Sequence, residues 1–172
     1  MRGQWFPRGG MPVRKSLVTM ALALAVTAGL GLGLVRAAAA RSRSAAGGVR
    51  EGELRDCPGP PNCVSSFARD ATHAVEPLER PAEELDSVVD VALEALPRTR
   101  LVARSRNYAH LECRSRLFGF RDDLELLASG EVIHVRSASR WGRGDLGVNR
   151  RRVESLRALA ITDPVSSSVG PR

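Results

Sequence analysis

The chain has 172 residues, of which 43% are hydrophobic, 26% are charged and 4% are aromatic. This composition excludes a wholly disordered chain and a protein with many membrane spans, and so few aromatic residues argue against a nucleic-acid surface built on base stacking. Residues 1–40 contain five basic residues and no acidic residue, so only +2 of the net charge of +7 remains for the rest of the chain, and we expect no nucleic-acid partner.

An uncharged apolar run occupies residues 17–35, shortly after Arg14 and Lys15. As a helix this run would be about 28 Å long, which matches the hydrocarbon thickness of a bilayer. Two interpretations are open for residues 1–40. They form a signal peptide that is cleaved within the small residues 37–40, or they form an uncleaved anchor that contacts the membrane through residues 17–35. Either interpretation places the following domain outside the cytoplasm, in the periplasm or cell envelope.

The rest of the chain divides into three regions by composition. Residues 41–56 are rich in Ser, Gly, Ala and alternating charges without apolar periodicity, which is typical of a flexible tether. Residues 57–161 carry the periodic apolar patterns of a folded domain. Residues 162–172 predict a disordered tail.

Periodic patterns predict the elements of the folded domain. Apolar side chains recur at helical spacing from Ala82 to Leu96, and Asn149 is expected to cap a second helix over residues 150–160. Between these helices, a short run with an apolar centre predicts a β-strand over residues 100–104, and alternating patterns predict strands over residues 108–115, 120–127 and 131–138. The fold class that follows is α+β, with an antiparallel β-sheet of about five strands, two helices packed on one face and the other face exposed to water.

Cysteine spacing indicates one disulfide. Cys57 and Cys63 close a short loop, and in an oxidising compartment a pair so placed is expected to form a disulfide rather than a C-x-x-C redox motif. Cys113 alternates with apolar residues in a predicted strand, so we expect a buried free thiol.

The histidines and one aspartate are the candidates for catalytic or metal-binding groups. His110 and His134 are expected on the wet face of the sheet, where no local ligand cluster accompanies them, so we predict no metal site and no cofactor. Asp122 falls at the same alternate positions as the apolar residues of its predicted strand, so its side chain is expected on the apolar face, as a buried carboxylate. It either pairs with an arginine such as Arg140 or with backbone donors of the following loop, or acts as a general acid or base with His110 or His134.

The segment from Arg136 to Arg152 contains six arginines around two turn glycines. Free N–H groups at a helix start, hydroxyl groups and arginine forks together can bind an anion. In this interpretation Arg136, Arg140 and Arg150 converge beside the helix N-terminus; in the alternative, nearby carboxylates neutralise the arginines. The candidate anion-binding residues are Arg136, Ser137, Ser139, Arg140, Asp145, Asn149 and Arg150.

Three segments resemble one family of bacterial and plastid proteins, the domain of unknown function 1499. They are Cys57–Ser66 (CPGPPNCVSS), Phe118–Glu125 (FGFRDDLE) and Val132–Arg151 (VIHVRSASRWGRGDLGVNRR). The resemblance covers roughly residues 56–160. Because members of this family carry a signal, lipoprotein or membrane segment ahead of the domain, the resemblance implies an extracytoplasmic or membrane-associated protein, and it implies no particular activity.

Two functions from different classes follow from the sequence. The first is a noncatalytic envelope module that binds an anionic small molecule or a partner protein through residues 136–152, with no catalytic residue. The alternative is an envelope hydrolase that uses Asp122 with His110 or His134.

Overall fold

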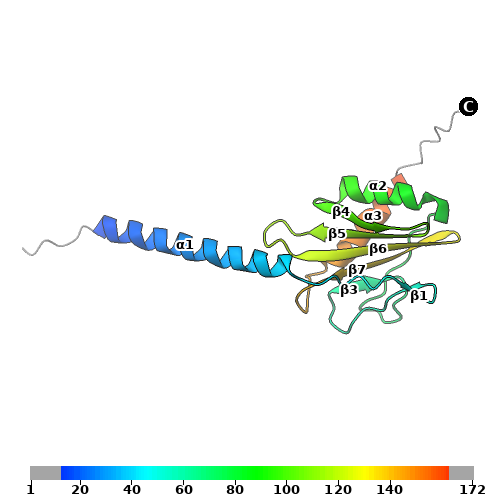
Figure 1. The fold of residues 1–172 in the computed structure, drawn as a ribbon, viewed down its shortest axis with the longest axis horizontal. Helices are drawn as coiled ribbons and strands as arrows, with labels where there is room; N and C mark the ends of the chain where they lie inside the picture. Colours follow the sequence, from blue (N-terminus) through cyan, green and yellow to red (C-terminus); the bar gives the residue numbers. More distant parts are fainter. Residues whose placement is uncertain (1–12, 163–172) are drawn as a thin grey trace, which may run out of the picture.

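The computed structural model describes residues 13–162, and Figure 1 shows their arrangement. The predicted tail lies outside the described residues except for Thr162, the last residue of a helix. At the other end, α1 (Val13–Ala40) is a long helix that extends away from the rest of the molecule. Its residues Leu17–Ala40 have a mean hydropathy of 2.1, and the most apolar stretch is not buried. By length and composition this helix could cross a membrane, a property that signal sequences share.

Five antiparallel strands form the main sheet, in the order β3-β7-β6-β5-β4. Their bounds are Cys63–Ser65 (β3), Thr99–Arg104 (β4), Tyr108–Arg114 (β5), Arg121–Ser129 (β6) and Val132–Ser139 (β7). The four strands predicted from the sequence correspond to β4 through β7. The predicted α+β class and the antiparallel sheet of about five strands are therefore confirmed. A separate short hairpin consists of β1 (Val49–Arg50) and β2 (Glu53–Leu54).

Two further helices, α2 (Leu85–Ala95) and α3 (Val148–Thr162), contact each other and share one hydrophobic core with the sheet. A 3₁₀ turn, η1 (Ala82–Glu84), precedes α2. The buried residues of α2 recur at helical spacing, so one stripe of the helix packs into the core. The number of helices differs from the prediction of two helices on one sheet face. The described residues contain three α-helices, and α1 and α3 are the first and last elements of the described chain.

The start of α3 differs from the prediction that Asn149 caps it. The helix begins at Val148, two residues before the predicted start, and the Asp145 carboxylate accepts hydrogen bonds from the N–H groups of Gly147 (2.9 Å) and Asn149 (2.7 Å). The side chain of Asn149 is fully buried and donates instead to the Asn62 carbonyl and the Ser139 hydroxyl, both at 2.9 Å. Aspartate and asparagine are equally good caps, so composition alone could not separate them.

The sheet face that we predicted to be wet is buried. On this face Glu112, Asp123, Glu125 and Arg136 are between 0% and 2% exposed. The covering segment comes from residues 41–56, which we predicted to be a flexible tether. Its backbone N–H groups donate hydrogen bonds to carboxylates on β6. The N–H of Ala45 donates to Asp123 at 2.6 Å, and the N–H of Gly48 donates to Glu125 at 2.9 Å. This segment is thus attached to the sheet by hydrogen bonds, which corrects the prediction.

The predicted cysteine states are confirmed. A disulfide joins Cys57 to Cys63, and Cys113 is a buried free thiol on β5. Burial raises the pKa of Cys113, and the Thr99 hydroxyl donates a hydrogen bond to its sulfur at 3.3 Å. The thiol form is therefore the form expected at neutral pH.

Candidate anion-binding site

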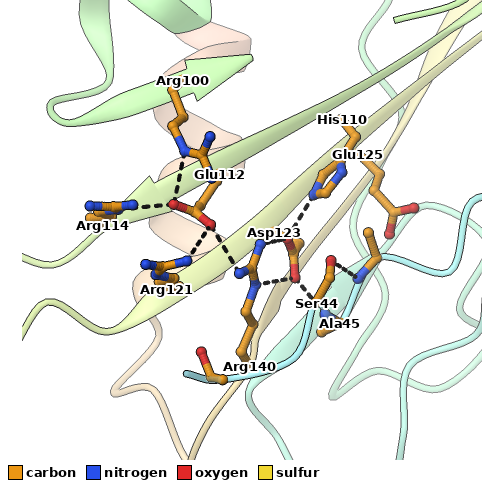
Figure 2. A network of polar contacts seen from close by, with 12 residues as sticks. Ser44, Ala45, Arg100, His110, Glu112, Arg114, Arg121, Asp123, Glu125 and Arg140 are labelled. Carbon is orange, nitrogen blue, oxygen red and sulfur yellow. Dashed lines mark hydrogen bonds and ion pairs between the residues drawn. The ribbon is translucent and has the colours of Figure 1, made fainter. Parts of the chain in front are cut away.

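A network of charged side chains occupies the covered face of the sheet (Figure 2). At one end of the network, the carboxylate of Glu112 on β5 is 1% exposed and is shared by four guanidinium groups. The nitrogen–oxygen distances to Glu112 are 3.0 Å from Arg100, 2.9 Å from Arg114, 3.3 Å from Arg121 and 2.9 Å from Arg140. Arg140 also pairs with Asp123, whereas Glu112 is the carboxylate that the structure gives to Arg100, Arg114 and Arg121.

Asp123 on β6 forms the centre of the network. Arg140 binds its two carboxylate oxygens as a fork, from Nε at 2.9 Å and from Nη2 at 2.6 Å. His110 Nε2 lies 2.6 Å from Oδ1, and the N–H of Ala45 completes the set at 2.6 Å (Figure 2). A fully buried carboxylate is tolerated only when it is paired and hydrogen-bonded in this way.

Glu125 and Arg136 form the other end of the network. Nη1 of Arg136 lies 2.8 Å from Glu125 Oε2 and also donates to the Ala45 carbonyl at 3.0 Å. The Tyr108 hydroxyl donates to Oε1 at 2.8 Å. Burial, together with the negative charge of Glu125, raises the pKa of Tyr108, so the phenol stays protonated as the donor.

The arginines decide the protonation state of the buried carboxylates. Burial alone would raise the pKa of Glu112, but hydrogen bonds from Arg100 and Arg114 and the charge of Arg140 outweigh burial and lower this pKa to about 2. Burial likewise acts to raise the pKa of Asp123, and hydrogen bonds from His110 and Arg140 lower it well below its usual value. Both groups are therefore ionised at neutral pH.

Glu112 makes the stability of the fold sensitive to acid. Its pKa of about 2 in the folded protein lies below the ordinary value of 4.5, so the unfolded chain binds more protons between these two pH values. The stabilisation is complete above the ordinary pKa and is lost as the pH falls toward the folded pKa. In urea denaturation we expect the free energy of unfolding of the wild type to fall over this window more steeply than that of Glu112→Gln, by up to about 1.4 kcal/mol per pH unit. Equal slopes in the two chains would contradict the role of Glu112.

The structure does not bring together the arginines of the predicted anion site. Arg136 and Arg140 are paired with carboxylates inside the covered face. Arg150 on α3 donates instead to the carbonyl groups of Thr72 at 2.9 Å and Ala74 at 2.8 Å. The predicted convergence beside the helix start is therefore wrong, because carboxylates and carbonyl groups of the chain itself already bind these guanidiniums.

The remaining predicted residues form a separate cluster between β7 and α3. The Ser137 hydroxyl donates to Asn149 Oδ1 at 2.7 Å, and Arg152 donates to the Ser137 hydroxyl at 2.9 Å. Arg152 also pairs with Asp122 at 2.6 Å. Asp122 is thus a buried carboxylate with an arginine partner, but the partner is Arg152 rather than Arg140.

The arrangement required for the predicted hydrolase is absent from the described residues. Asp122 and Asp123 are neighbours in a strand, so their side chains lie on opposite faces of the sheet. His110 contacts Asp123, and His134 is paired across the sheet with Leu127, which shares the face of Asp123. Asp122 therefore has both histidines on the far side of the sheet.

His134 contacts Ser66 beside an open cleft of about 790 Å³ that Ser66 lines. Its Nδ1 lies 3.2 Å from the Ser66 hydroxyl oxygen, and its ring stacks on Phe67 with centroids 4.1 Å apart. Burial lowers the pKa of His134, which favours the neutral imidazole. The N–H of Val135 donates to the same hydroxyl oxygen at 3.0 Å, so Ser66 ties its loop to β7 and has a structural role.

A second cleft, of about 530 Å³, lies where α1 meets the domain. Six arginines and no acidic residue are among the described residues that line it. We call it the arginine cleft. Its lining residues are Arg36, Ala40, Arg98, Thr99, Arg100, Arg114, Ser115, Arg116, Gly119 and Arg121.

The arginine cleft carries positive charge that its carboxylate contacts do not balance. Arg100, Arg114 and Arg121 share the single charge of Glu112, which Arg140 also contacts. The other three lining arginines, Arg36, Arg98 and Arg116, have exposed side chains. Chemically, this arrangement can bind a multiply charged anion through guanidinium forks. Among the described residues, no group of three or more His, Cys, Asp or Glu side chains is placed to hold a metal ion.

Sequence reasoning missed the arginine cleft because its residues come from separated segments. A usable signal was present, since Arg98 and Arg100 alternate at the start of β4, and Arg114 and Arg116 alternate at the end of β5. These two strand ends lie side by side, with Arg100 opposite Glu112 in the register. Two Arg-x-Arg pairs on neighbouring strands predict a cluster once the pairing is known.

Comparison with known proteins identifies the family. A family model described as "Protein of unknown function (DUF1499)" matches residues 53–159. No curated protein and no solved structure matches the chain. The matched range includes β3 through β7, all of α2, most of α3 and all of the carboxylates of the buried network. Since this match covers more than half of the sequence, the chain belongs to the DUF1499 family of proteins of unknown function.

Proposed function

We propose that this protein is a noncatalytic module of the cell envelope, held at the membrane by α1, which binds an anionic ligand in the arginine cleft. The observation that carries the proposal is the set of six arginines in the lining, without an acidic residue among the described lining residues. This site replaces residues 136–152, where Arg136, Arg140 and Arg150 are bound within the fold.

The extracytoplasmic location is supported by two features. Disulfides such as Cys57–Cys63 form and persist in oxidising compartments outside the cytoplasm. The apolar helix α1 has the length and composition of a membrane span near the N-terminus.

Retention of α1 as an anchor is supported by its contacts with the domain. Ala39, near the end of the helix, is 1% exposed, and Arg36 lines the arginine cleft. Cleavage within residues 37–40 would separate Arg36 from the cleft. An uncleaved anchor keeps all six arginines in one place.

Anion binding is favoured by the electrostatics of the arginine cleft. Like charges that are held close together repel each other, so a bound anion lowers the free energy of the cluster. Glu112 holds Arg100 and Arg114 in fixed positions through bonds of 3.0 and 2.9 Å, which reduces the entropy lost on binding. Arginine is well suited to phosphate and carboxylate groups because its planar fork donates two parallel hydrogen bonds.

A titration with inorganic pyrophosphate tests the proposal. We expect the full chain in neutral detergent micelles to unfold at a higher temperature as pyrophosphate is added at constant ionic strength. At a pyrophosphate concentration of 100 times the Kd, the free energy of unfolding should rise by about 2.7 kcal/mol. The double variant Arg98→Gln/Arg116→Gln should lose most of this stabilisation, because both side chains are exposed in the cleft and neither contacts Glu112.

Arg106→Gln is the matched control, since Arg106 is exposed in the turn between β4 and β5, at the opposite end of the sheet. It should respond to pyrophosphate as the wild type does. An equal loss in the control, or no stabilisation of the wild type, would overturn the proposal.

A further inference from the structure

A group of apolar side chains is exposed beside the arginine cleft. Leu117 and Phe118, in the loop between β5 and β6, are 58% and 40% exposed, and Trp141, in the loop after β7, is 54% exposed. Phe120 lies between the aromatic rings, with centroids 5.3 Å from Phe118 and 5.1 Å from Trp141. We call Leu117, Phe118, Phe120 and Trp141 the apolar tip. It contains three of only seven aromatic residues in the chain.

The apolar tip and the arginine cleft are parts of one surface. The loop that carries Leu117 and Phe118 also supplies Ser115, Arg116 and Gly119 to the cleft lining. Gly119 has φ +68°, a conformation that favours glycine, and a Cβ at this position would lie 3.9 Å from Nε of Arg36. Figure 1 shows this loop projecting toward the end of α1.

The sequence of α1 fixes where a membrane would lie relative to this surface. The uncharged run ends at Val35, and the next residue, Arg36, lines the arginine cleft. If α1 crosses a bilayer, the boundary between hydrocarbon and headgroups falls near Arg36. The apolar tip is then at the level of the lipid headgroups.

We propose that the apolar tip inserts into the interface of the bilayer that α1 crosses, while the arginine cleft binds phosphate groups of anionic phospholipids. This inference rests on the proposed function and names its ligand. Tryptophan and other aromatic side chains favour the interface between headgroups and hydrocarbon, and arginine pairs there with anionic headgroups. The exposed aromatic rings of the apolar tip match the interface, and the unbalanced positive charge of the arginine cleft matches the anionic headgroups. α1 and the tip thus hold the domain against the membrane at two points.

Tryptophan fluorescence of the full chain in lipid nanodiscs tests this docking. Trp5→Phe leaves Trp141 as the single tryptophan. In nanodiscs that contain phosphatidylglycerol, we expect Trp141 emission to shift to shorter wavelength and to be quenched by brominated phospholipid. Pure phosphatidylcholine should reduce this quenching severalfold, and Phe118→Ser should reduce it in either lipid.

The control tryptophan stands at the far end of the sheet. In the triple variant Trp5→Phe/Trp141→Phe/Arg106→Trp, emission should be quenched by acrylamide in water and not by brominated lipid. Equal lipid quenching of Trp141 and the control tryptophan would overturn the docking proposal, as would lipid quenching of Trp141 that Phe118→Ser leaves unchanged.

Added pyrophosphate separates the two proposals. Where phospholipid occupies the arginine cleft, pyrophosphate should bind at least tenfold more weakly in phosphatidylglycerol nanodiscs than in detergent. Pyrophosphate binding that the lipid leaves unchanged, with Trp141 in water, would overturn docking and retain the cleft as a site for a free anion. Docking of Trp141 without pyrophosphate binding in detergent would instead overturn the proposed function.

Discussion

Asp123→Asn is expected to lower the free energy of unfolding by about 3–5 kcal/mol, the usual cost of removing one partner from a buried ion pair. The change keeps the shape of the side chain but removes the charge that Arg140 and His110 contact at 2.6 Å. Arg140 would then remain inside the fold, with only Glu112 as a charged partner and with three other arginines competing for it. Urea denaturation at neutral pH measures the effect.

Glu154→Gln is the matched control for Asp123→Asn. Glu154 pairs with Arg157 on the exposed side of α3, where its side chain is 51% exposed. A surface pair of this kind contributes about 0.2–1 kcal/mol, so this variant should unfold close to the wild type. An Asp123→Asn chain that is no less stable than the control would show that the network does not hold the sheet face together.

Ala45→Pro is expected to destabilise the protein by about 2 kcal/mol, because proline removes the N–H group that donates to Asp123 at 2.6 Å. The carbonyl of residue 45, which accepts a hydrogen bond from Arg136, is retained. The substitution therefore tests whether the segment ahead of the domain acts as a cover over the charged face. Chemical denaturation of the full chain in detergent measures the change.

Ala46→Pro separates the lost hydrogen bond from the general effect of proline. The N–H of Ala46 donates only to the neighbouring Ser44 hydroxyl at 3.1 Å. This variant should lose much less stability than Ala45→Pro. Similar stability of both variants would mean that the segment behaves as the flexible tether that its composition predicts.

The features that the sequence predicted correctly depend on local patterns. Alternation of apolar side chains located β5, β6 and β7 to within two residues, because each strand packs one face on the core. The disulfide followed from the short spacing of Cys57 and Cys63, which needs no long-range information. The burial of Asp122 followed from its parity with apolar neighbours, whereas its partner Arg152 was not predicted.

The errors concern charged residues whose partners are distant in sequence. Glu112, Asp123 and Glu125 alternate with apolar residues, a pattern that an exposed face would produce equally well. Their burial depends on strand register and on Ala45, which lies 78 residues before Asp123. Six arginines near one turn also suggested an anion site, but density in sequence does not reveal which guanidiniums already have partners inside the fold. In the arginine cleft, by contrast, the arginines are far apart in the sequence and close together in the structure.

Whether an anion binds in the arginine cleft or beside α3 is measured most directly by NMR of the arginine Nε–H groups during a pyrophosphate titration of the full chain. The signals of Arg98, Arg100, Arg114 and Arg116 should shift together and saturate at one Kd. Those of Arg136, Arg140 and Arg152 should stay in place, because these side chains are at most 11% exposed and do not line the cleft. Saturable shifts of Arg136, Arg140 and Arg150, with Arg98, Arg100, Arg114 and Arg116 unchanged, would contradict the arginine cleft as the binding site.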